Sequence, residues 1–201
     1  MIPEFSHLLA ILSAGLMLYS SLIGIVNHTS NKSYKLRQLT HNTFNAAAFF
    51  LFLSFAVYIY LAIQDDFSVA YIASHSNSDL PIFYKISSIW SAHEGSMFLW
   101  ITFLVGWLWL FINHTKNDHE FFELIIIFSA ILIFGFLLFL LATSSPFERI
   151  LPVTPLNGAD INPVLQDPAL AIHPPMLYLG YCLLYTSDAA DEGLGVDLGG
   201  R

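Results

Sequence analysis

The sequence predicts an all-α fold: a polytopic helical membrane protein with four complete transmembrane helices and a truncated fifth. Hydrophobic residues make up 56% of the chain and charged residues 11%, whereas roughly a quarter of the residues of a soluble domain are charged. A membrane-spanning helix needs about 20 apolar residues. Runs of about that length occupy approximately residues 7–26, 44–63, 95–112 and 121–142, and a fifth run begins near Pro174 and stops short.

The first two runs are predicted to form a transmembrane hairpin. Ser20 and Gly24 have the spacing of small residues that lets membrane helices approach closely. The first run is expected to be a retained span rather than a signal peptide, because the acidic Glu4 precedes it and the run is too long for a signal core. A polar loop over residues 27–42 is expected to join the two spans.

The placement of Lys and Arg predicts the orientation, because cytoplasmic loops are enriched in these residues. The long loops, 64–94 and 143–173, carry Lys85 and Arg149. The much shorter loops on the other side carry a larger set: Lys32, Lys35, Arg37 and Lys116. The N-terminus and both long loops are therefore expected on the periplasmic side or its equivalent.

The first long loop is predicted to end in a short amphipathic helix on the membrane surface. Pro81 is suited to begin a helix, and Phe83, Ile86 and Trp90 recur at helical spacing. Gly95 follows at the entrance of the third span, where a missing side chain permits close backbone approach.

Three residues near this entrance are second-tier site candidates. His93 and Glu94 form an ionisable pair that could contact a ligand or a partner. Adjacent helical residues do not share a face, so an interfacial polar collar is the favoured alternative. Trp100 lies nearer mid-span than the other tryptophans, whose positions the interfacial enrichment of tryptophan explains.

Composition excludes several function classes. Glu123 is the only acidic or basic residue inside the four predicted spans, which argues against ion or proton transport, because transport needs buried charges or broken helices. The sequence has no basic patch of the kind that would indicate nucleic acid as a partner. Cys182 is the only cysteine, so the chain has no internal disulfide, zinc cluster or C-x-x-C-H motif.

The second long loop has several polar residues that favour turns and helix starts. Asp160 and Asn162 are turn formers, and Asp167 is placed to cap a helix that begins at Pro168. Four residues of this loop are further second-tier site candidates: Asp160, Asn162, Gln166 and Asp167.

His173 is the strongest site candidate. A proline disfavours helical geometry at the residue before it, so the short helix is expected to end at His173 and the next to begin at Pro174 and Pro175. An imidazole at such a membrane-surface helix entrance is a candidate ligand for a metal or for haem iron. A purely structural histidine at a helix end is the alternative.

Three segments closely resemble the CcmF family of cytochrome c maturation proteins. They are LPIFYKISSIWSAHEGSMFLW (80–100), PFERI (146–150) and GADINPVLQDPALAIHPPMLYLGY (158–181). The paralogous family devoted to nitrite reductase maturation shares much of this pattern and is the alternative within the group.

The resemblance implies a haem-handling protein of the bacterial inner membrane, with His173 as an axial ligand of haem at the periplasmic face. It further implies that b-type haem arrives from the chaperone CcmE and becomes c-type. CcmH-type partners help present apocytochrome c, whose C-x-x-C-H thiols form the thioether bonds. The family is a haem lyase of the holocytochrome c synthase type.

The resemblance also sets the expected division of the chain. Residues 1–88 are expected to form the hairpin and first periplasmic loop, and 89–181 part of the haem-handling domain. Residues 182–201 are Gly- and Asp-rich and are expected to be a non-native tail. The family's Trp-rich periplasmic signature, second periplasmic histidine and transmembrane histidine pair are missing, so this stretch is not expected to catalyse ligation alone. The rival functions are a non-catalytic assembly scaffold and a transporter subunit.

Overall fold

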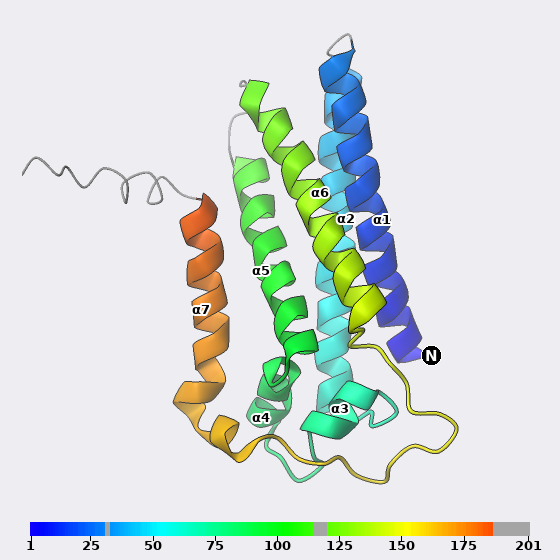
Figure 1. Ribbon diagram of the computed structural model, residues 1–201, viewed down its shortest axis with the longest axis vertical. Helices are drawn as coiled ribbons and strands as arrows, with labels where there is room; N and C mark the ends of the chain where they lie inside the picture. The colour runs from blue at the N-terminus through cyan, green and yellow to red at the C-terminus, as the bar shows by residue number, and fades with distance from the viewer. Residues whose placement is uncertain (31–32, 115–119, 187–201) are drawn as a thin grey trace, which may run out of the picture.

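The computed structural model describes residues 1–30, 33–114 and 120–186, and it confirms the all-α architecture. Its long helices form a bundle (Figure 1): α1 (Ile2–Thr29), α2 (Tyr34–Ile63), α5 (His93–His114), α6 (Glu120–Thr143) and α7 (Pro168–Thr186). The connections carry α3 (Ala70–His75), α4 (Ile82–Ser87) and the 3₁₀ turns η1 (Ser88–Trp90) and η2 (Pro163–Gln166).

Four of these helices, α1, α2, α5 and α6, are long and apolar enough to cross a membrane, as predicted. They extend beyond the apolar runs into polar flanks. The prediction of a loop over residues 27–42 was wrong, because α2 already begins at Tyr34. The flank of α2 contains Lys, Leu, Arg and Gln, which are good helix formers. Lys32 and Lys116 lie outside the described residues.

Buried polar residues at seven-residue spacing run along α1 and join it to its neighbours. The Ser6, Ser13 and Ser20 hydroxyls donate to the α2 carbonyls of Ser54 (2.8 Å), Ala47 (2.8 Å) and Thr40 (2.9 Å), respectively. The next member, Asn27, donates from Nδ2 to Glu123 Oε1 of α6 at 2.5 Å. Hydrogen bonds between membrane helices stabilise their association when apolar burial cannot drive it.

Gly24 confirms the predicted close-packing face of α1. A Cβ atom at Gly24 would lie 2.5 Å from Cγ1 of Ile127 in α6 and 3.4 Å from Cγ2 of Thr40 in α2. Ser20, one turn earlier, is fully buried against α2. The small residues therefore let α1 contact both helices at once.

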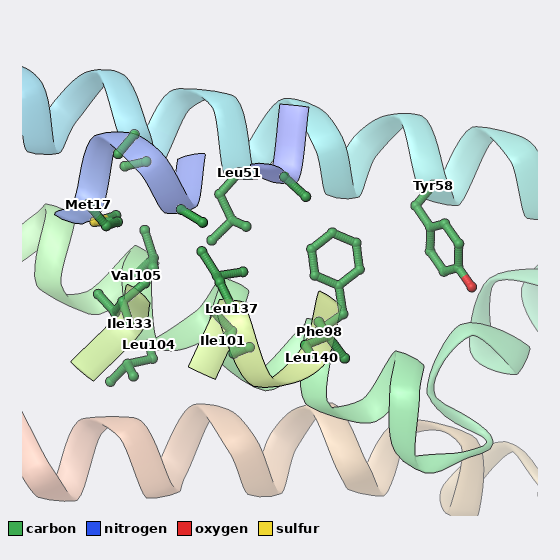
Figure 2. Close-up of a cluster of buried hydrophobic side chains, with 14 of the residues drawn as sticks. Met17, Leu51, Tyr58, Phe98, Ile101, Leu104, Val105, Ile133, Leu137 and Leu140 are labelled. Carbon is green, nitrogen blue, oxygen red and sulfur yellow. The ribbon is translucent and has the colours of Figure 1, made fainter. Parts of the chain in front are cut away.

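The apolar core lies between α1, α2, α5 and α6. Figure 2 shows Leu51, Ile101 and Leu137 meeting from α2, α5 and α6, and all three are fully buried. Tyr58 lies farther along α2, where its ring packs edge-on against Phe98. Helix α7 lies beside α5, on the outside of this core (Figure 1).

Both long loops gather at one end of the bundle, the end that also holds the N-terminus (Figure 1). Their backbones pair, since Ala70 N donates to Glu148 O (2.8 Å) and Ile150 N donates to Ser68 O (2.9 Å). The second loop also docks on α3 through Ala159 N, which donates to Ala73 O (2.8 Å). The short helix predicted after Pro81 is present as α4, whereas α3 was not predicted.

The entrance of α5 is packed around Tyr71 of α3. The Tyr71 hydroxyl donates to Ile89 O (2.7 Å) and accepts from Ala92 N (3.0 Å). A Cβ atom at Gly95 would lie 1.6 Å from Ile89 O and 2.7 Å from the Tyr71 hydroxyl. The predicted close backbone approach at Gly95 is therefore confirmed, and it fixes the turn that carries Trp90.

Substituting Gly95→Ala is expected to destabilise the protein by about 1–3 kcal/mol, because the added methyl group overlaps a backbone carbonyl that is held in place. Gly135→Ala is the matched control, since a Cβ atom at Gly135 meets nothing within 4 Å. Thermal unfolding of the purified chain in detergent measures both. Equal melting temperatures for the two variants would contradict this packing.

Substituting Tyr71→Phe is expected to reduce stability, most strongly below about pH 10. Burial raises the pKa of Tyr71 to about 12 from its ordinary value of 10.0. The unfolded chain therefore releases this proton first as the pH rises. The stability due to the neutral phenol is fully present below about pH 10 and is lost as the pH approaches about 12, a change of about 2–3 kcal/mol.

Denaturant titrations of the wild-type and Tyr71→Phe chains, run from about pH 8 to about pH 11, measure this difference across the onset of tyrosine ionisation. The gap between the two unfolding free energies should narrow above about pH 10. A gap that stays constant with pH would show that the hydroxyl is not buried and paired in this way.

Candidate functional site

The segment with His173 is one continuous helix, which corrects the sequence prediction. Helix α7 runs through Pro174 and Pro175, whereas the helix was predicted to end at His173 and a new one to start after it. The preference against helix before proline is a local one and does not decide the backbone here. This turn of α7 also accepts a hydrogen bond from outside the helix. Trp90 Nε1 donates to the carbonyl oxygen of Ala171 at 2.8 Å.

The start of α7 forms as predicted. Asp167 Oδ1 accepts from Ala169 N (2.8 Å) and Leu170 N (3.2 Å), and Pro168 is the first helical residue. This cap satisfies backbone donors that have no partner within the helix.

The other polar candidates of this loop also shape its backbone. Asp160 has a positive φ of 83° and its Oδ1 accepts from Ile161 N (2.8 Å). Asn162 Oδ1 accepts from Val164 N (3.1 Å) and caps η2. Gln166 is exposed at the end of η2. Three of the four candidates thus position the chain that leads to His173.

His173 is exposed and is surrounded by exposed apolar side chains. Leu170, Met176 and Leu177 lie three or four residues away on the same face of α7, and they are 44%, 61% and 46% exposed, respectively. No hydrogen bond or ion pair engages the imidazole within the described part of the chain. The result is an available nitrogen ligand on an apolar platform.

The chemistry of this arrangement suits a single axial ligand of haem iron. Among the described residues, no group of three or more His, Cys, Asp or Glu side chains is placed to hold a metal. Iron in haem is already held by the porphyrin and needs only axial ligands. The apolar side chains around His173 suit the flat apolar face of a porphyrin.

The structure brings His93, Glu94 and Trp100 together, but apart from His173. These three line a cavity of about 830 Å³ between α5, α6 and α7, to which α7 contributes Leu177 and Tyr178. His93 Nε2 lies 3.3 Å from Glu94 Oε1. The His93 side chain is 78% exposed, whereas Glu94 is 25% exposed.

Trp100 also lines a second cavity of about 680 Å³, which continues between the same helices towards Phe111 and Ser129. Its ring packs edge-on against Phe136 of α6, with a centroid separation of 4.9 Å. The second-tier candidate Trp100 therefore lines both cavities, as does Tyr181.

Two tryptophans that were assigned to the interface make specific contacts with α7. Trp90 donates to Ala171 O, and Trp107 donates from Nε1 to Leu179 O at 3.2 Å. The only sequence signal for the Trp90 contact was the double proline, which leaves a carbonyl oxygen in need of an outside donor. The partner itself, 81 residues away, could not be read from local pattern.

Comparisons with known proteins agree with these features. The family described as "Cytochrome C assembly protein" matches residues 90–188. The Pseudomonas aeruginosa cytochrome c-type biogenesis protein CcmF is 41% identical over 90% of this chain and 28% of its own length. CycK of Bradyrhizobium diazoefficiens, also named a cytochrome c-type biogenesis protein, is 39% identical over 90% of this chain and 27% of its own length.

Relatives that are named NrfE and described as cytochrome c-type biogenesis proteins are similar as well. NrfE of Haemophilus influenzae is 45% identical over 64% of this chain and 20% of its own length. The chain thus spans about a quarter of the length of the curated relatives it matches. No solved structure matches it significantly. The similarity covers both the bundle and the segment with His173, and the chain belongs to the CcmF family of cytochrome c-type biogenesis proteins.

Proposed function

We propose that the protein handles haem during cytochrome c maturation and that His173 is an axial ligand of the haem iron. The observation that carries this proposal is the unengaged imidazole on the exposed apolar face of α7. The names of the relatives, cytochrome c-type biogenesis proteins, support the same process.

We further propose that this site lies on the periplasmic side of the inner membrane. The loops at the His173 end hold Lys85 and Arg149, and both are ion-paired: Lys85 with Asp65, and Arg149 with Glu4 at 2.9 Å. Lys35 and Arg37, near the start of α2, lie at the opposite end of the bundle. In the sequence the short loops carry four Lys or Arg residues and the long loops carry two, and this difference supports the orientation in which the N-terminus is periplasmic.

The residues of the chain would act by holding and orienting the porphyrin. His173 would bind the iron from one side, Leu170, Met176 and Leu177 would pack against the ring, and the Asp167 cap would hold the first turn of α7. Bound haem supplies the vinyl groups to which the thiols of apocytochrome c add. Its delivery by a CcmE-type chaperone and the presentation of apocytochrome by CcmH-type partners are part of the proposal for the whole protein.

The second-tier residues have a separate place in this proposal. His93, Glu94 and Trp100 line the cavity beside α7, which borders the face that carries His173 at Leu177 but does not include His173 itself. We therefore expect them to affect the packing of α7 against α5 and not the iron directly. Residues 182–186 continue α7, and residues 187–201, most of the predicted tail, lie outside the described residues.

Substituting His173→Ala is expected to weaken hemin binding by the purified chain at least about tenfold, because the axial nitrogen is lost, and to abolish the absorption typical of a histidine-ligated haem. His114→Ala is the matched control. His114 is also exposed, but it is the last residue of α5, and it lies at the end of that helix away from Trp90 and the start of α7. Hemin titration followed by visible absorption measures both.

The two outcomes separate the proposal from its rivals. Retention of the histidine-type spectrum by the His173→Ala chain would exclude His173 as the ligand. A wild-type chain that binds no hemin above the level of detergent alone would instead favour the assembly scaffold.

A further inference from the structure

We infer that Trp90 is a positioning residue for His173: its indole N–H holds α7 helical through the double proline and so sets where the imidazole stands. This inference rests on the proposed function of His173 as a haem ligand. The hydrogen bond itself is a property of the chain without haem, so the two can be tested separately.

The double proline leaves one carbonyl oxygen without a donor in its own helix. In an α-helix the carbonyl of Ala171 accepts from the backbone N–H four residues later, which is Pro175 and has none. The tighter 3₁₀ alternative would use the N–H three residues later, which is Pro174 and also has none. Leu170 differs, because His173 can still supply the 3₁₀ donor.

Water cannot easily replace the missing donor. Ala171 is 1% exposed and faces the rest of the protein. A buried carbonyl without a partner is costly. Trp90 Nε1, at 2.8 Å, supplies the hydrogen bond that the helix cannot make.

Trp90 is itself held firmly. It ends η1, and the Tyr71 hydroxyl binds the backbone on both sides of it, at Ile89 O and at Ala92 N. Gly95 lies against the carbonyl of Ile89 with no room for a side chain. The contact from Trp90 therefore joins a rigid turn at the entrance of α5 to a point two residues before His173.

A second tryptophan provides a comparison within the same region. Trp107 also donates to a carbonyl of α7, that of Leu179. The residue four positions after Leu179 is Leu183, which has a backbone N–H and lies within α7. The Leu179 carbonyl thus has a helical donor as well, and loss of the Trp107 bond leaves it satisfied.

The decisive experiment compares Trp90→Phe with Trp107→Phe in the purified chain. Each variant loses one indole N–H and keeps an aromatic ring. Amide hydrogen exchange without haem should accelerate about tenfold or more across residues 169–173 in the Trp90→Phe chain only, because its α7 contains an unsatisfied buried carbonyl. Hemin affinity should fall about tenfold in the same variant, with loss of the absorption typical of a histidine-ligated haem.

Restoring the missing donor within the helix provides a rescue test. Pro175→Ala gives residue 175 an N–H that can bond to Ala171 O. In this background, Trp90→Phe should no longer accelerate exchange or weaken hemin binding, which is the coupling that a double-mutant cycle measures. A loss that persists in the Pro175→Ala background would overturn the inference, since it would show that the ring and not the hydrogen bond matters.

The remaining outcomes distinguish the two proposals. If Trp90→Phe changes neither exchange nor hemin affinity while His173→Ala abolishes binding, the positioning role is refuted and the proposed function stands. If His173→Ala leaves hemin binding intact, the proposed function fails, and the exchange data without haem then decide alone whether Trp90 holds α7 through the double proline.

Discussion

Every backbone carbonyl and N–H group that is buried in a membrane protein needs a partner, and this constraint organises the described structure. Regular helices meet it internally, so α1, α2, α5 and α6 can be almost wholly apolar. The exceptions are informative. Where the chain departs from regular helix, at the entrance of α5 and at the double proline of α7, side chains from elsewhere complete the pairing.

The same side chains connect the separate parts of the site. Tyr71 and Trp90 both come from the first long loop, from α3 and η1, and Ala171 comes from the first turn of α7. The segment that carries His173 is thus anchored to the four-helix core through a series of specific hydrogen bonds. Such support gives a ligand a defined position although α7 lies at the outside of the bundle.

The sequence was sufficient to predict the spans, the close approach at Gly95 and the Asp167 cap. Each depends on a local property: hydrophobicity over about 20 residues, the missing side chain of glycine, or a capping residue next to a proline. The short helix after Pro81 was predictable for the same reason. Features that depend on distant contacts were not. The rule that proline ends a helix one residue earlier failed at His173, in a turn of α7 that accepts a hydrogen bond from the distant Trp90. The cavity shared by His93, Glu94 and Trp100 likewise forms only when α5, α6 and α7 are assembled.

The most direct test of the central claim is chemical rescue of the ligand. A His173→Gly chain loaded with hemin is supplied with ¹⁵N-labelled imidazole, and pulsed electron paramagnetic resonance detects nitrogen bound to iron. If His173 is the axial ligand, the histidine nitrogen coupling that the wild-type chain shows without added imidazole is absent from the His173→Gly chain, where the labelled nitrogen replaces it. Histidine nitrogen couplings that persist unchanged in the His173→Gly chain, with no labelled signal, would contradict it.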